Sequence, residues 1–210
     1  MKYLYEFIGT FFLVFTVGMA VMGPNSAGNL APVAIGSVLA VLVYAGGSVS
    51  GGHYNPAVSL AVFLRKKLSI KDLGVYWIVQ FLGGALAALT ALYFKGTPEI
   101  QALEFDSTKV FLAEFLFTFL LCFVVLNAAT LKLNQNNSYF GFAIGFTVLV
   151  GAFAVGTISG AAFNPAVAFG AAIMNLSEWS NLWVFIVAAF LGSFVSAFLV
   201  NQVESPEKGH

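Results

Sequence analysis

Long apolar stretches alternate with short polar ones along the whole chain. A helix that spans a bilayer needs about 20 predominantly apolar residues. Six runs meet that requirement, at 3–23, 33–49, 73–94, 109–131, 139–158 and 180–201. Two further apolar runs, 55–64 and 164–174, are too short to cross and suit segments that enter a membrane and turn back. The pattern therefore predicts an all-α membrane protein with six transmembrane helices and two re-entrant half-helices.

The composition agrees with a membrane location and narrows the function. Of the 210 residues, 60% are hydrophobic and 9% are charged, whereas soluble domains carry about 25% charged residues. The formal net charge is zero, so there is no electrostatic case for a nucleic-acid partner. The chain has two histidines and one cysteine, Cys122, which excludes an intramolecular disulfide. No metal-ligand cluster or nucleophile constellation stands out, so we expect neither an enzyme nor a cofactor.

The chain is also an internal duplication. The segment YEFIGTFFLVF at 5–15 recurs as AEFLFTFLLCF at 113–123, and three other segments recur 109 residues later. Each half, about 3–94 and 109–201, then holds three spans and one half-helix, and an odd number of spans inverts the second half relative to the first. We expect one transmembrane domain over 1–210, ending in a polar tail at 202–210.

Because Glu6 interrupts the first run and a near copy of that run recurs in mid-chain, we do not interpret it as a cleaved signal peptide. Loop charges then predict the orientation. With the N-terminus inside, seven cations lie on the inner side: Lys2, Arg65, Lys66, Lys67, Lys71, Lys132 and Lys208. Two lie outside: Lys95 and Lys109. This excess follows the positive-inside rule and predicts a multi-pass protein of the plasma or inner cell membrane with both termini cytoplasmic. Aromatic residues near the span ends suit an interfacial belt: Tyr3, Tyr5, Tyr76, Trp77, Tyr93, Trp179 and Trp183.

Each short run begins at an Asn-Pro pair, Asn55-Pro56 and Asn164-Pro165. Asparagine is a strong helix N-cap and proline is favoured at the first helical position, so both pairs predict helix starts. The glycine-rich approach to each pair suits irregular backbone, which is tolerated at membrane depth only inside protein or along a watery cavity. Each helix start carries about half a positive elementary charge. Two such ends meeting at the midplane would repel cations.

The doubled motif resembles the aquaporin, or major intrinsic protein, family over about residues 3–201. The motifs that carry the resemblance are Asn55-Pro56-Ala57, Asn164-Pro165-Ala166, the S-G-G-H-x-N-P-A-V lead-in, Glu6-Phe7 and Glu114-Phe115. The resemblance implies a homotetramer in the lipid bilayer whose subunits each conduct water or small uncharged, glycerol-like solutes passively in single file. It implies that Asn55 and Asn164 donate hydrogen bonds to the permeating molecule. It also implies a ladder of acceptor carbonyls at Gly51, Gly52, His53, Tyr54, Gly160, Ala161, Ala162 and Phe163.

The buried acids leave alternatives open. Glu6 and Glu114 could form the proton-coupling pair of a secondary transporter, because carboxylates inside spans are costly and functional. Their identical place in the two repeats favours loop scaffolding, which the family resemblance also implies. His53 could line the pore, respond to pH or bond to loop backbone, and we favour scaffolding next to the pore. A poorly conducting membrane scaffold is a third interpretation, although short loops disfavour large partner surfaces.

One position departs from the family pattern. The family usually has arginine directly after the second N-P-A, and this chain has Val167. The resemblance implies that this residue belongs to an outer constriction, a ring of four positions that here are Ile35, Ala152, Ala161 and Val167. Such a ring would be wide and apolar unless Phe105 or Phe163 narrows it. The single arginine, Arg65, lies at the inner end of the first half-helix and is too far to substitute. Other discriminating positions are mixed between the water-channel and glycerol-channel patterns: Ala168, Ala172, Phe185 and Ile186. We expect the asparagine region alone to block most cation flux.

Overall fold

The computed structural model describes residues 1–98, 105–134 and 136–203, and all regular structure in these segments is helical. The long helices are α1 (Lys2–Val21), α2 (Ala31–Ser50), α4 (Ile70–Lys95), α5 (Ser107–Thr130), α6 (Phe140–Ser159) and α8 (Leu182–Val203). The short helices are α3 (Pro56–Leu64) and α7 (Pro165–Ile173), with 3-10 turns η1 (Gly28–Leu30), η2 (Lys132–Asn134) and η3 (Trp179–Asn181). All six long helices are apolar and long enough to cross a membrane, as the pattern predicts.

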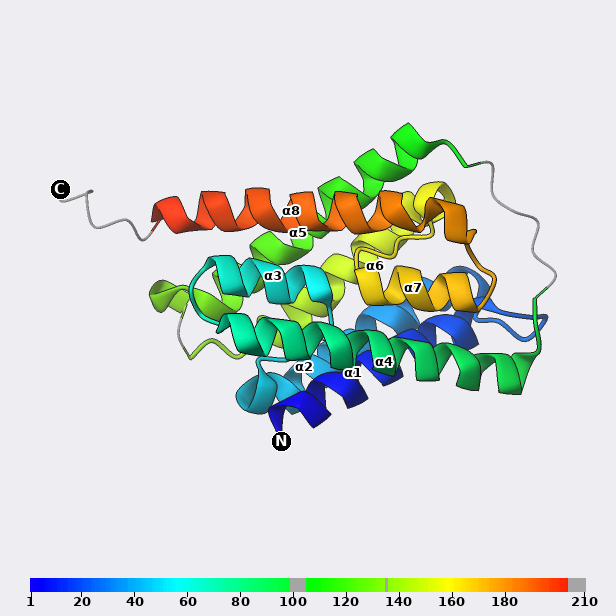
Figure 1. Cartoon of the computed structure of the whole chain (residues 1–210), viewed down its shortest axis with the longest axis horizontal. Coiled ribbons are helices and arrows are strands. Elements are labelled where there is room, and N and C mark those ends of the chain that lie inside the picture. The colour runs from blue at the N-terminus through cyan, green and yellow to red at the C-terminus, as the bar shows by residue number, and fades with distance from the viewer. Residues whose placement is uncertain (99–104, 135, 204–210) are drawn as a thin grey trace.

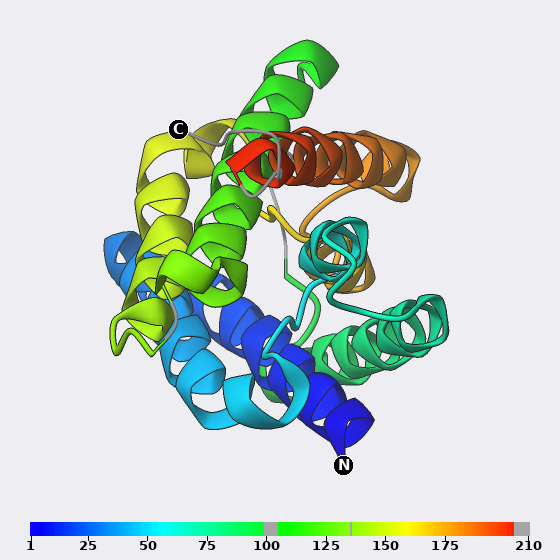
Figure 2. The same ribbon diagram turned by 90° about the vertical axis from the view of Figure 1, so that its left-hand side faces the viewer.

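The two half-helices lie end to end between α4 and α8, where the ring of long helices is open (Figure 1 and Figure 2). Figure 1 shows α3 and α7 along one line, and Figure 2 looks down that line with α7 behind α3. Among the long helices, α1 packs mainly on α4, α5 on α8, and α2 on α6. The half-helix α3 packs on α8 of the other repeat, and α7 packs on α4 of the other repeat. Each repeat therefore supports the half-helix of the other.

Glycines allow the backbones of α2, in the first repeat, and α6, in the second repeat, to approach closely. A Cβ atom built on Gly36 would lie 2.7 Å from the carbonyl oxygen of Gly145, and one built on Gly145 would collide with the carbonyl oxygen of Gly36. Any larger side chain at either position would push the backbones apart. Small residues that allow such contact are typical of packed membrane helices.

The side of the bundle on which α1 begins and α8 ends is called here the near side, and the opposite side is the far side. Arg65 follows the last residue of α3 on the near side, where its guanidinium donates to Asn201 Oδ1 at 2.7 Å. Its Nε also lies 3.4 Å from Thr130 Oγ1. The side chain thus ties α3 to α8 and α5. Because Val167 lies at the start of α7, which enters from the far side, Arg65 cannot serve the constriction there.

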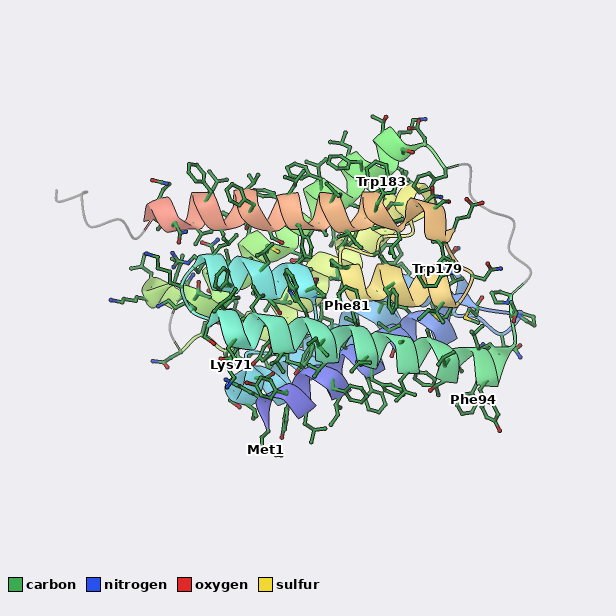
Figure 3. All side chains as sticks on the ribbon, viewed as in Figure 1. Met1, Lys71, Phe81, Phe94, Trp179 and Trp183 are labelled. Atoms are coloured by element: carbon green, nitrogen blue, oxygen red, sulfur yellow. The ribbon has the colours of Figure 1, made fainter. Side chains whose placement is uncertain are left out.

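The aromatic residues divide into two groups. Figure 3 shows Trp179 and Trp183 toward one end of the bundle, and both are more than half exposed, as an interfacial belt predicts. The expectation is wrong for Tyr76, whose side chain is buried and donates to the Ser50 carbonyl. Tyr76 is buried because its ring packs against the rings of Tyr3 and His53. Trp77 is half-buried, and its Nε1 donates to the Pro56 carbonyl at 3.0 Å.

The predicted tail boundary moves slightly, because α8 remains helical to Val203. Most of the predicted tail, 204–210, lies outside the described residues.

Candidate functional site

The Asn-Pro pairs begin the two half-helices and hold them together. Asn55 Oδ1 accepts a hydrogen bond from Ala57 N at 2.8 Å, and Asn164 Oδ1 accepts one from Ala166 N at 2.9 Å. These are N-cap bonds of the kind that satisfies a helix start. The Asn55 amide also donates to the Phe163 carbonyl at 3.0 Å, and the Asn164 amide donates to the Tyr54 carbonyl at 2.9 Å. Since a side-chain amide has two N–H groups, each asparagine keeps one for another partner.

A cavity of about 700 Å³ runs beside this junction, and both asparagines line it. All four residues of the predicted ring also line it: Ile35, Ala152, Ala161 and Val167. Five residues of the predicted carbonyl ladder are in the lining: Gly52, His53, Gly160, Ala161 and Ala162. The other three, Gly51, Tyr54 and Phe163, are not. The carbonyls of Tyr54 and Phe163 instead accept the asparagine cross-links.

Two aromatic residues proposed to narrow the ring do not do so. The Phe163 ring is buried and stacks on Phe117 with centroids 5.3 Å apart, away from the cavity. Phe105 lines a separate, smaller hollow with Asp106 and Lys109. Neither Phe105 nor Phe163 therefore lines the cavity.

Several lining residues were not predicted. They are apolar residues of α1 and α5 toward the middle of the cavity and polar or aromatic residues toward the far side: Leu13, Val17, Leu121, Val125, Asn29, Phe153, Thr157 and Ser177. Phe153 adjoins Ala152 in sequence, which was the only signal available for it. The polar ones lie near helix ends, where sequence alone does not say which way a side chain points.

The approach to α3 is held by one buried carboxylate. Glu6 Oε1 accepts from Ser50 Oγ at 2.7 Å and from His53 N at 2.9 Å, while Oε2 accepts from Tyr54 N at 2.7 Å and from Gln80 Nε2 at 2.8 Å. Four donors surround the group, and Glu6 is fully buried. This arrangement compensates a buried negative charge with hydrogen bonds.

The approach to α7 repeats the device. Glu114 Oε1 accepts from Ser159 Oγ at 2.7 Å and from Ala162 N at 3.0 Å, and Oε2 accepts from Phe163 N at 2.7 Å. Glu114 is fully buried, and neither it nor Glu6 lines the cavity. Both carboxylates bind loop backbone in the way that the scaffolding interpretation predicts.

The carboxylates hold backbone that is otherwise unfavourable. Tyr54 and Phe163 adopt nearly equal positive φ angles of 49° and 48°, in the left-handed region that most residues avoid. Ala161 also lies there, at 53°, where the first repeat has Gly52 at 64°. Such conformations cost about 1–3 kcal/mol each and persist only when the surroundings impose them. Here the backbone N–H of Tyr54 donates to Glu6, and that of Phe163 donates to Glu114.

The two repeats differ in the support behind the loops. Gln80 links Glu6 to Ser59 in the first repeat, whereas the positions 109 residues later are Ala189 and Ala168. Glu114 therefore receives three hydrogen bonds where Glu6 receives four. No simple repeat signal could reveal Gln80 or Ser59, because the second half has no counterpart.

The chain also resembles known proteins. The family model of the major intrinsic protein matches residues 1–200. The chain belongs to the major intrinsic protein family.

Individual relatives span almost the whole chain. Nodulin-26 of Glycine max is 32% identical over 99% of this chain and 79% of its own length, and aquaporin NIP1-2 of Arabidopsis thaliana is 34% identical over 99% and 75%. The glycerol uptake facilitator protein-like 6 of Lactiplantibacillus plantarum is 33% identical over 98% and 99%. In fold, the chain matches the aquaglyceroporin of Plasmodium falciparum with a TM-score of 0.81 and 22% identity, over 98% of this chain and 96% of that one.

Membership of the major intrinsic protein family confirms the expected fold class and a membrane channel in place of an enzyme.

Proposed function

We propose that this member of the major intrinsic protein family conducts water and small uncharged solutes passively through the cavity beside Asn55 and Asn164. The observation that carries the proposal is the junction of two helix N-termini on one cavity that spans both repeats. The spare amide N–H of each asparagine supplies a donor to a permeating molecule. The positive ends of both helix dipoles oppose cations at the same place.

The far-side ring sets the solute size. Ile35, Ala152, Ala161 and Val167 offer neither charge nor side-chain hydrogen-bonding groups. Without an arginine the ring is wider and apolar, so we propose that it admits solutes larger than water, of the size of glycerol. Two relatives with the names of an aquaporin and of a glycerol uptake facilitator support this range. The junction of Asn55 and Asn164 then excludes protons and cations without help from a ring arginine.

A coupled transporter has less support. That alternative rested on Glu6 and Glu114, and both carboxylates are enclosed by loop donors and do not line the cavity. We therefore assign both glutamates, together with the backbone N–H of His53, to holding the loops.

The remaining expectations complete the proposal. One channel domain covers 1–210, assembled as a homotetramer in the plasma or inner cell membrane. The excess of lysine and arginine predicted for the inner segments supports a cytoplasmic position for the near side and for both termini. The far side with its apolar ring then faces outward.

Stopped-flow light scattering tests the proposal on purified protein in liposomes, with water and glycerol gradients run side by side. We expect both fluxes above those of protein-free liposomes. Rates equal to protein-free liposomes for both would refute a channel. Fast water with no glycerol flux would show that the assigned ring is wrong or incomplete.

Two variants of one ring position separate charge from size. Val167→Arg adds bulk and a fixed cation, whereas Val167→Met adds bulk of similar length without charge. We expect the arginine to reduce glycerol flux most and to retain water flux, with methionine intermediate. Unchanged glycerol flux in both variants would place the constriction elsewhere.

A further inference from the structure

His53 is the only titratable side chain that lines the cavity among the described residues. Its backbone N–H is bound to Glu6, but its ring has a separate partner: Nδ1 lies 3.0 Å from Ser59 Oγ. Nε2 has no hydrogen-bond partner in the described part of the chain and is not sealed from the cavity. Whether Nε2 carries a proton therefore decides whether the imidazole offers the pore a donor or an acceptor.

The orientation of the Gln80 side-chain amide determines whether the Ser59 hydroxyl accepts or donates a hydrogen bond toward Gln80. The Gln80 Nε2 group lies 2.8 Å from Glu6 Oε2 and 3.0 Å from Ser59 Oγ. The opposite amide orientation would place an oxygen against the Glu6 carboxylate, which can only accept. Gln80 therefore presents N–H groups to both neighbours, and Ser59 Oγ accepts one of them.

The hydroxyl hydrogen of Ser59 then needs an acceptor. Ser59 is fully buried, and no carbonyl oxygen among the described residues accepts from its Oγ. The nitrogen left within reach is His53 Nδ1. If Nδ1 carried a proton, Oγ would face two donors and its own hydrogen would be unpaired, which is costly in a buried group. If Nδ1 is bare, the Ser59 hydroxyl donates to it, and the donors of both Gln80 and Ser59 have acceptors.

We propose that the hydrogen-bonded series Gln80–Ser59–His53 fixes the neutral imidazole with Nδ1 unprotonated and Nε2 protonated. His53 then offers the pore a hydrogen-bond donor and no proton acceptor. Gln80 and Ser59 are positioning residues in this arrangement, and His53 is the group that meets the permeating molecule. The inference rests on the proposed channel function for its consequence, but the protonation pattern itself does not.

The consequence concerns protons and cations. A bare Nε2 in the cavity would take a proton from a passing hydronium ion and could hand it on. A protonated Nε2 instead adds a third side-chain donor to those of Asn55 and Asn164 and turns the positive end of an N–H dipole toward the pore. The geometry thus supplies a barrier at the middle of a channel whose far-side ring has no arginine.

The chain has only two histidines, so the protonation pattern can be measured directly. His210→Gln leaves His53 as the single histidine. The protein, labelled with ¹⁵N-histidine and reconstituted in phosphatidylcholine bilayers, is examined by solid-state NMR at neutral pH. We expect Nδ1 at the shift of a bare ring nitrogen and Nε2 at that of a protonated one. The favoured form should exceed the other by about tenfold, the ratio for about 1.4 kcal/mol. A protonated Nδ1 would overturn the proposal and would leave the proposed channel function untouched.

Two variants test how the pattern is set. Ser59→Ala removes the donor to Nδ1, and we expect the Nδ1 signal to move toward the average of both neutral forms. Gln80→Met removes the competing donor to Ser59, and we expect a shift toward the Nδ1-protonated form. Ser196→Ala removes another buried hydroxyl, which has no hydrogen-bond partner in the described part of the chain, and should leave both signals in place. Wild-type signals in the Ser59 and Gln80 variants would show that these residues do not position the ring.

Flux measurements then separate this inference from the proposed function. With a pH indicator inside the liposomes, Ser59→Ala should pass protons faster than either the wild type or Ser196→Ala. Equal proton flux would overturn the barrier role of His53 even if water conduction is confirmed. Water and glycerol fluxes no faster than those of protein-free liposomes would refute the channel, whereas the NMR measurement tests the protonation pattern independently of any flux.

Discussion

Each asparagine both caps its own half-helix and donates a hydrogen bond to the backbone before the other one, and serine and alanine variants separate the two contributions to stability. In Asn164→Ser, the serine hydroxyl can still cap α7, but the hydrogen bond to the Tyr54 carbonyl is lost. A net hydrogen bond is worth about 1 kcal/mol, so we expect unfolding free energy to fall by about that amount. Asn164→Ala removes the cap as well, which typically costs about 1 kcal/mol more. The expected ratio of losses is therefore about two to one.

The measurement is reversible unfolding in mixed dodecyl sulfate and maltoside micelles, followed by circular dichroism. The first repeat provides the matched pair, since Asn55 makes the corresponding cap and cross-link to Ala57 and Phe163. Asn55→Ser and Asn55→Ala should show the same ratio. Equal losses in the serine and alanine variants would mean that the cap contributes nothing. A loss below about 0.5 kcal/mol in every variant would refute the stabilising role of the junction.

Two further predictions concern other parts of the molecule. Gly145→Ala would drive a Cβ into the Gly36 carbonyl, so we expect about 1–3 kcal/mol of lost stability by thermal unfolding; Gly156→Ala, which would meet no atom within 4 Å, is the control and should lose nothing. Asp106 caps α5 by accepting from the backbone N–H of Lys109, which together with the Lys109 ammonium holds the pKa of the Asp106 carboxyl below its usual value. Its contribution is therefore complete above the unfolded-state pKa of about 3.9 and is lost as the pH falls through the folded-state value. The thermal midpoint of Asp106→Asn should depend less on pH in this range than that of wild type, and identical profiles would contradict this account.

The repeat made much of the fold and part of the site predictable. Glu6 and Glu114 occupy matching positions, and the duplication therefore favoured a shared scaffolding role over a proton-coupling pair. The Asn-Pro pairs predicted both helix starts because N-cap chemistry is local. By contrast, Gln80 and Ser59 have only alanines as counterparts, and their bonds to Glu6 and His53 depend on helices that meet only in three dimensions.

The direction in which individual side chains point could not be predicted from the sequence. The sequence allowed Phe163 to narrow the ring, but in the structure its backbone has a positive φ and its side chain stacks on Phe117 inside the bundle. Tyr76 lies near a span end, which suits either an interfacial or a buried ring. Only the three-dimensional structure shows that Tyr3, His53 and the Ser50 carbonyl surround its ring.

The reciprocal cross-links also bear on how the chain is made. They join residues 108 and 110 positions apart, so the first half-helix lacks its partner until most of the second repeat has been synthesised. Glu6 enters with the first span, where an acidic side chain is costly before its hydrogen-bond donors arrive. Biogenesis of this protein is therefore a late, cooperative event in which neither half completes its own pore segment. Ribosome-stalled chains that end before residue 164 should accordingly leave the first re-entrant loop open to protease.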